Sequence, residues 1–373
     1  MAKRRKKAKK LPITLVVFLL VIAIVVCFVL YKKGYITFEE EPKHEHPPQG
    51  EDIITDELSI HFPMLGNKYS GDCTLIKVGD TEILIDAGSK KNSAAALISY
   101  INGYCTDGVL EYVVATHAHE DHIAAFVGLS GGEGIFEAFK CETIIDFPLT
   151  ESTSGVYKEY VELRDNEVAT DGAKHYTALE CWNNANGAQR SYTLDEGITF
   201  NILYQKFYEE DASTENDYSV CTLLSQGDNH YLFTGDLDRD GELSLVEENS
   251  LPKCKLFKAG HHGSYTSSNA ELMAVIQPEI VCVCCCCGNS SEYRYTDMNN
   301  VFPSQAFIDR VSPYTDKIYV TTLYSETAEN NYEPLNGNII VSSDGGEVKV
   351  ACSASSLILK ETEWFQQNRK WNG

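Results

Sequence analysis

Three histidines and two carboxylates lie within six residues in the segment "VVATHAHEDH", residues 113–122. The apolar, β-branched run before them is typical of a buried strand. In an extended segment His117 and His119 project to the same side, while Asp121 and His122 open the next helix and turn back toward that side. Imidazole and carboxylate together suit zinc, and imidazole-rich sites also hold iron or manganese. The spacing therefore predicts a metal site.

Two later segments place more ligand types at the ends of apolar runs. "YLFTGD" ends in Asp236, and "LFKAGHHGS" contains Lys258, His261 and His262. Five of the ten histidines thus fall in two short motifs, which is not the pattern of scattered surface residues. Open α/β sheets gather their sites at the carboxyl ends of strands. We therefore expect these segments to meet the first motif.

Short apolar strands and amphipathic helices alternate along the chain. Their mixture predicts one layered α/β domain over 58–351. Strands are expected at 58–65, 73–79, 81–88, 110–116, 198–204, 219–225, 230–236, 253–260, 278–285, 317–322, 337–345 and 347–351, and helices at 93–103, 121–129, 239–248, 268–276 and 302–311. Residues 148–197 carry no motif and are interpreted as an insertion that walls the site. The tail, 352–373, is expected to pack on the domain.

Cysteine is abundant, with 13 residues, five of them in "CVCCCC" at 282–287. Neighbouring residues of a strand point to opposite faces, so this run suits a buried strand with cysteine as a small hydrophobic residue. The odd total and the absence of a regular spacing argue against a disulfide scaffold.

The ordered motifs resemble the metallo-β-lactamase superfamily. Within it they are most similar to the extracytoplasmic metallo-hydrolase domain of the competence DNA-uptake channel ComEC and its free-standing relatives. The motifs that carry the resemblance are "SGDC" (70–73), "LIDAG" (84–88), "THAHEDH" (116–122), "NDYS" (216–219), "TGD" (234–236) and "KAGHHGS" (258–264). The resemblance spans about 58–351, and the ordered set is specific although each piece alone is weak.

This resemblance implies a four-layer αβ/βα sandwich with one or two divalent ions at one edge, zinc first and manganese or iron as alternatives. The implied ligands are His117 and His119 for one ion, Asp121, His122 and His262 for the other, and Asp236 between the two. Whether His261 or His262 is the ligand stays open, with His262 preferred.

The resemblance also implies catalytic roles for Asp121, Lys258 and His261. A bound zinc ion lowers the pKa of its water from 15.7 toward about 7, which gives hydroxide at neutral pH. Asp121 would orient or deprotonate that water, and Lys258 and His261 would hold oxygens of the substrate.

Two departures from the family pattern stand out. Many relatives have a further histidine for the first ion, but the matching segment here, "ENDYSV" at 215–220, has none. We expect one tight ion and one weaker ion unless Asn216 or Asp217 completes the first site, and antibiotic hydrolysis is disfavoured. Where the family shows Y-x-H-P, this chain keeps Tyr293 but has Phe302 before its proline.

A phosphoester or phosphodiester is the substrate best matched to such a centre. Hydrolysis of another ester, such as a lactone, is an alternative. A non-catalytic, metal-stabilised binding module is a second alternative. It is less favoured, because a purely structural zinc needs no open coordination position. The whole chain has a net charge of −23. Residues 1–35 hold nine Lys or Arg and no acid, so residues 36–373 have a net charge of −32. This acidity disfavours nucleic acid as a partner.

The N-terminal residues are predicted to anchor the protein in the membrane. The basic residues 1–10 precede about twenty uncharged apolar residues, long enough for a transmembrane helix at 11–31. The positive-inside rule puts the basic tail in the cytoplasm and the hydrolase domain outside the cell, behind an acidic, proline-containing linker at 32–57. A cleaved signal peptide is the alternative.

Overall fold

The computed structural model describes residues 57–373, which form two eight-stranded β-sheets with helices against them. The first sheet has the spatial order β16 (Val348–Cys352), β15 (Ile339–Ser343), β1 (Leu58–Phe62), β2 (Cys73–Val78), β3 (Thr81–Ala87), β4 (Val109–Val114), β5 (Lys140–Asp146) and β6 (Lys174–Thr177). The second has the order β14 (Tyr332–Pro334), β13 (Ile318–Tyr324), β12 (Ile280–Cys287), β11 (Leu256–Lys258), β10 (Asn229–Phe233), β9 (Thr222–Gln226), β8 (Ile198–Ile202) and β7 (Ser191–Asp195).

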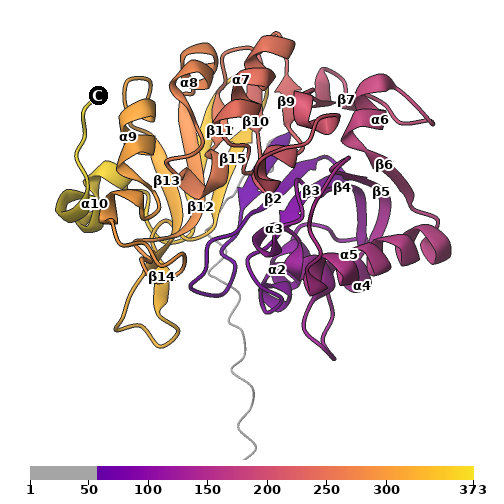
Figure 1. Cartoon of the computed structure of the whole chain (residues 1–373), viewed down its shortest axis with the longest axis horizontal. Coiled ribbons are helices and arrows are strands. Elements are labelled where there is room, and N and C mark those ends of the chain that lie inside the picture. Colours follow the sequence, from indigo (N-terminus) through magenta and orange to yellow (C-terminus); the bar gives the residue numbers. More distant parts are fainter. Residues whose placement is uncertain (1–56) are drawn as a thin grey trace, which may run out of the picture. The chain divides into compact units, whose positions relative to one another are not determined.

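Helices cover the outer face of each sheet (Figure 1). Those of the first sheet are α2 (Ser93–Ile101), α3 (Glu120–Val127), α4 (Ile135–Ala138) and α5 (Gly155–Asn166), and those of the second are α7 (Arg239–Glu248), α8 (Ala270–Ile276) and α9 (Gln305–Val311). Helix, sheet, sheet and helix follow one another, which is consistent with the predicted αβ/βα sandwich.

Each sheet contains a run of parallel strands. In the first sheet β3, β4, β5 and β6 are parallel, and in the second β10, β11, β12 and β13 are parallel. The carboxyl ends of parallel strands lie at one edge of a sheet, so the loops after β4, β10 and β11 are held near one another. These loops carry the three ligand-bearing motifs.

The cysteine-rich strand β12 is buried along its full length, as its apolar composition predicts. Parallel neighbours on both sides and layers on both faces remove it from water, so small apolar side chains fit at successive positions. All twelve cysteines in the described part of the chain are free thiols, and eleven of them are buried. Burial raises the pKa of each thiol of the run, for example to about 12 at Cys284.

The unassigned segment 148–197 is more regular than its sequence indicates. It contains α5, β6, α6 (Ala178–Asn183) and β7, and its two strands form one edge of each sheet. Strand β5 was also absent from the expected elements. Polar residues alternate weakly in these edge strands, so the sequence lacks the apolar run that marks an inner strand.

The C-terminal residues pack against the second sheet's layer. Helix α10 (Glu363–Asn368) buries Phe365, and the Arg369 guanidinium donates to the carbonyls of Val301 at 2.6 Å and Pro303 at 2.8 Å.

The predicted basic tail, transmembrane helix and nearly all of the linker lie outside the described residues. Among the helices from residue 57 onward, none is long and apolar enough to cross a membrane.

Candidate metal centre

The loop after β4 presents the first pair of histidines. His119 has an extended backbone and precedes the first turn of α3, which begins at Glu120. The Nε2 atom of His117 and the Nδ1 atom of His119 lie 2.9 Å apart. His117 is buried and His119 is exposed. The two imidazoles therefore lie next to each other, one inside the protein and one at its surface.

The remaining predicted ligands meet around the carboxylate of Asp236. Its Oδ2 atom lies 3.1 Å from the Nε2 atom of His122 and 3.4 Å from the Nε2 atom of His262. The Nε2 atom of His262 also lies 3.5 Å from the Oδ2 atom of Asp121. Asp72 joins this group, since one ligand atom from each of Asp72, His122, Asp236 and His262 lies within 4.8 Å of the others.

Several polar side-chain atoms in this cluster lack a hydrogen-bond partner. The Nε2 atoms of His122 and His262 and the Oδ1 atom of Asp236 are all buried and unpaired. Leaving a buried polar atom unsatisfied costs about 1–3 kcal/mol. A divalent cation satisfies two imidazole nitrogens and a carboxylate together, so these residues fit a zinc-type ion.

Asp86, from the "LIDAG" motif, fixes the orientation of His122. Its Oδ2 atom accepts from the Nδ1 atom of His122 and from the Thr116 hydroxyl, each at 2.7 Å, and its Oδ1 atom accepts from the Thr116 amide at 2.7 Å. With Nδ1 committed to Asp86, the Nε2 atom of His122 remains free for a metal. The backbone of Asp86 is left-handed, at φ 59°, a conformation that Asp and Asn tolerate better than most residues.

The glycine of "LIDAG" permits close packing against the start of α3. A Cβ atom on Gly88 would lie 1.5 Å from the carbonyl oxygen of Asp121. The amide of Asp72, from "SGDC", donates to that same oxygen at 3.0 Å. Both motifs therefore hold the helix start that carries two ligands. Sequence reasoning quoted these motifs but gave Asp72 and Asp86 no role.

The second motif turns sharply so that His262 enters the cluster. His261 and His262 are both left-handed, at φ 45° and 54°, and Gly263 follows at 81°. The Nδ1 atom of His262 lies 3.0 Å from the carbonyl oxygen of Cys284, which leaves Nε2 toward Asp236. The Nε2 atom of His261 is 3.8 Å from the Oδ2 atom of Asp236, farther than that of His262 at 3.4 Å. This geometry favours His262 as the ligand.

Electrostatics distinguish the buried ligands from one another. Burial lowers the pKa of His122, but the charges of Asp236 and Asp86 outweigh it and raise that pKa well above its usual value. Burial raises the pKa of Asp121, yet the imidazole of His262, 3.5 Å away, and the charge of His122 hold it below its ordinary range. Burial lowers the pKa of His117, as do its neighbouring histidines, so His117 is neutral and ready to bind a cation.

Lys258, which was predicted to hold an oxygen of the substrate, is buried. It is 2% exposed, and its ammonium forms an ion pair with Asp72. The Oδ1 atom of Asp72 is in turn 3.0 Å from the Nδ1 atom of His262. Lys258 therefore reaches the centre through Asp72 and His262, and its direct contact with a substrate oxygen stays a prediction.

The structure separates the two residues considered for completing the first site. Asn216 is buried beside His261, with its amide nitrogen 3.3 Å from the Nδ1 atom of His261, and its Oδ1 atom has no partner. Asp217 instead turns toward Gly241, where an added Cβ atom would lie 3.0 Å from its Oδ1 atom. Burial raises the pKa of Asp217 to about 6. Asn216 is the better placed of the two.

His261 borders the cluster and is partly exposed. Its Nδ1 atom lies 2.9 Å from the Thr266 hydroxyl and 3.4 Å from the Oδ1 atom of Asp238. Its Nε2 atom is thus the one free to face the centre.

Three aromatic residues in mutual contact form a wall beside Asp121 and His262, namely Tyr293, Tyr295 and Phe302. The Tyr293 hydroxyl donates to the Oδ2 atom of Asp121 at 2.9 Å. The ring of Phe302 lies 5.2 Å from that of Tyr293 and 5.8 Å from that of His262, measured between centroids. Tyr293 thus hydrogen-bonds a predicted metal ligand, Asp121, a contact that the sequence did not predict.

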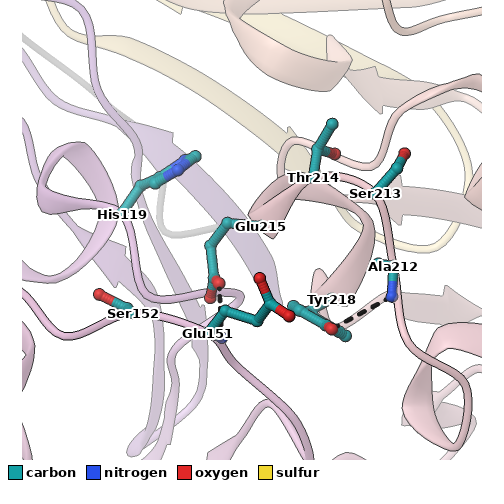
Figure 2. Close-up of a pocket in the computed structure, with 8 residues that line it drawn as sticks. All are labelled: His119, Glu151, Ser152, Ala212, Ser213, Thr214, Glu215 and Tyr218. Carbon is teal, nitrogen blue, oxygen red and sulfur yellow. Dashed lines mark hydrogen bonds between the residues drawn. The ribbon is translucent and has the colours of Figure 1, made fainter.

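A pocket of about 230 Å³ opens beside His119. Figure 2 shows His119 and Ser152 on one side, Ala212, Ser213 and Thr214 on the other, and Glu215 between them. The lining residues are His119, Glu151, Ser152, Ala212, Ser213, Thr214, Glu215 and Tyr218. The exposed imidazole of the centre therefore faces a space that a substrate can enter.

Comparison with known proteins agrees with the geometry. Residues 66–134 match the family model of the Metallo-beta-lactamase superfamily. The chain is 23% identical over 188 residues to ComE operon protein 3 of Bacillus subtilis, covering 50% of this chain and 21% of that protein. It is 23% identical over 265 residues to Recombination protein 2 of Haemophilus influenzae, covering 70% and 28%. The chain thus spans less than a third of either relative.

Among solved structures, the chain is similar to the metallo-beta-lactamase fold protein YhfI of Bacillus subtilis. That similarity has a TM-score of 0.42 and 12% identity, and it covers 70% of this chain and 96% of YhfI. The chain thus matches the family model of the Metallo-beta-lactamase superfamily over residues 66–134, the segment that holds "LIDAG" and "THAHEDH".

Proposed function

We propose that this protein is a metal-dependent phosphoesterase of phosphodiesterase type, anchored in the membrane with its catalytic domain outside the cytoplasm. The observation that carries the enzymatic part is the pair of buried, unpaired Nε2 atoms of His122 and His262, facing Asp236 at 3.1 and 3.4 Å. A purely structural ion is fully enclosed by protein ligands. Here the exposed His119 leaves one side of the centre open to a pocket.

A divalent ion held by these residues would act as a Lewis acid toward a phosphoryl oxygen and would lower the pKa of water toward neutrality. The chain's own groups would position the reactants. Asp121, fixed by the Tyr293 hydroxyl, accepts a hydrogen bond from the attacking water. His261 is partly exposed and has its Nε2 atom 3.8 Å from the Oδ2 atom of Asp236, so it would hold an oxygen of the substrate.

The membrane anchor rests on the sequence of residues 11–31 and on the charge asymmetry around them. A lactone or other ester remains a second candidate substrate, because the same centre polarises a carbonyl oxygen.

Hydrolysis of bis(p-nitrophenyl) phosphate by the purified full chain tests the proposal. Turnover should disappear with chelator, return with zinc and be lost in His262→Ala. His230→Ala is the matched control, since His230 lies at the start of β10, the end opposite Asp236, where its Nδ1 atom is 2.9 Å from the Ser225 hydroxyl. A lactone assayed in parallel separates the two ester classes. A metal-loaded protein that hydrolyses neither ester would contradict the proposal and favour a binding module.

A further inference from the structure

The pocket beside His119 is acidic. Two of its eight lining residues are the carboxylates Glu151 and Glu215, and none is Lys or Arg. Four others, Ser152, Ser213, Thr214 and Tyr218, carry hydroxyl groups. The pocket therefore offers negative charge and hydrogen-bond acceptors next to a centre suited to phosphate.

Three hydrogen bonds hold the side chain of Glu215, which lines this pocket. Its Oε1 atom accepts from the Thr150 hydroxyl at 2.6 Å and from the Ala118 amide at 3.3 Å, and its Oε2 atom accepts from the Glu151 amide at 3.1 Å. Because Ala118 lies between the two histidines of the first pair, Glu215 ties the pocket to the metal loop. These bonds fix the position of its charge relative to the metal loop.

Glu151 differs from Glu215 because its side chain is exposed. Figure 2 shows its carboxylate directed toward Tyr218 across the pocket. An anionic group entering here meets two like charges, so a second phosphate of a polymer is disfavoured and a cation is attracted.

The size of the pocket limits what it holds. About 230 Å³ is below the roughly 300–1,000 Å³ typical of pockets for drug-sized ligands. A short alkyl chain with one ammonium group fits this class better than a sugar polymer or a nucleotide chain.

We propose that this pocket binds the positively charged end of an amino alcohol whose hydroxyl is esterified to the phosphate. The substrate class is then a phosphoester of a small amino or quaternary ammonium alcohol. This inference rests on the proposed function, since it assigns the phosphate to the neighbouring metal centre. The choline and ethanolamine types share the required chemistry.

Two esters that differ in one atom test the inference on the full chain. One is p-nitrophenyl phosphocholine, and the other is p-nitrophenyl 3,3-dimethylbutyl phosphate, in which carbon replaces the charged nitrogen. Hydrolysis adds water across the P–O bond and releases p-nitrophenolate from both. We expect a higher kcat/KM for the cationic ester. The ratio of the two should fall about two- to fivefold in Glu151→Gln, the range for a partly exposed ion pair.

Glu326→Gln is the matched control, because Glu326 is an exposed glutamate in the connection from β13 to β14. It should keep the wild-type ratio. Equal kcat/KM for the two esters in the wild-type protein, or an unchanged ratio in Glu151→Gln, would overturn the inference.

Binding of choline phosphate and of 3,3-dimethylbutyl phosphate, measured by calorimetry, separates this inference from the proposed function. If neither ester is hydrolysed, the proposed function fails, while tighter binding of choline phosphate still supports the pocket and equal binding refutes it. Phosphatidylcholine vesicles distinguish the source of the group. Release of choline phosphate from them, beside turnover of the soluble ester, assigns a lipid source, and turnover of the soluble ester alone assigns a soluble one.

Discussion

Replacing Asp86 by Asn should weaken metal binding without disturbing the fold around the centre. The substitution keeps the size of the side chain and tolerates the left-handed backbone at φ 59°. It removes the charge that accepts from His122 at 2.7 Å, and it offers one acceptor oxygen where the carboxylate has two.

The magnitude follows from the hydrogen bonds. Asp86 accepts three, from the His122 ring, the Thr116 hydroxyl and the Thr116 amide. An amide oxygen facing His122 leaves the amide NH₂ against the Thr116 N–H, so at least one buried donor is unpaired, at about 1–3 kcal/mol. Loss of such a partner behind a metal-binding histidine costs about 10–100-fold in metal affinity.

Competition with a fluorescent zinc chelator gives the dissociation constants of wild type and Asp86→Asn, and thermal unfolding with and without zinc reports the same loss independently. Glu167→Gln is the control, because Glu167 is a buried carboxylate that accepts from the Cys141 amide at 3.3 Å, near the amino end of β5, and is not among the candidate ligands. Zinc affinity in Asp86→Asn within twofold of wild type would refute the assignment of Asp86 as the group that orients His122.

Three further predictions address the ligands, the aromatic wall and the packing behind the centre. Elemental analysis should find one equivalent of zinc fewer in His262→Ala than in wild type and no loss in His261→Ala; the reverse would exchange their roles. Tyr293→Phe should lower kcat about tenfold with metal content unchanged, because the hydroxyl orients the Asp121 carboxylate; an unchanged kcat would remove Tyr293 from the mechanism. Burial raises the pKa of Glu242 to about 8, so its stabilising contribution is complete below its unfolded pKa of 4.5 and is lost as pH rises through 8. Urea unfolding should therefore show a free energy that declines with pH by up to about 1.4 kcal/mol per unit, with a flatter profile in Glu242→Gln; parallel profiles would contradict this origin.

The inner strands and the ligand-bearing loops were predictable because both have strong local signals. Apolar runs mark β3, β4 and β12, and the clustered histidines mark the loop after β4. The edge strands β6 and β7 were missed because one face of each is polar, and short alternation over four or five residues resembles a loop.

Other features of the site depend on contacts far apart in sequence. Asp72 meets Lys258 across 186 positions, and the Tyr293 hydroxyl meets Asp121 across 172. No spacing rule indicates such pairs. The motif "LIDAG" did contain a usable signal, since an Asp at the end of an apolar strand, two residues before a glycine, indicates a second carboxylate near the histidines.

The centre is asymmetric, and this asymmetry has a physical cause. His122 and His262 are fully buried, and each has its Nδ1 atom committed, to Asp86 and to the carbonyl of Cys284. Their free nitrogens are therefore already oriented, so an ion bound there loses little conformational entropy from its ligands. His119 is exposed and no carboxylate holds its ring in the described structure, so an ion at the first pair must first order that side chain. This difference supports the expectation of one tight and one weaker ion, because the pair that would hold the weaker ion includes His119, which lines the pocket.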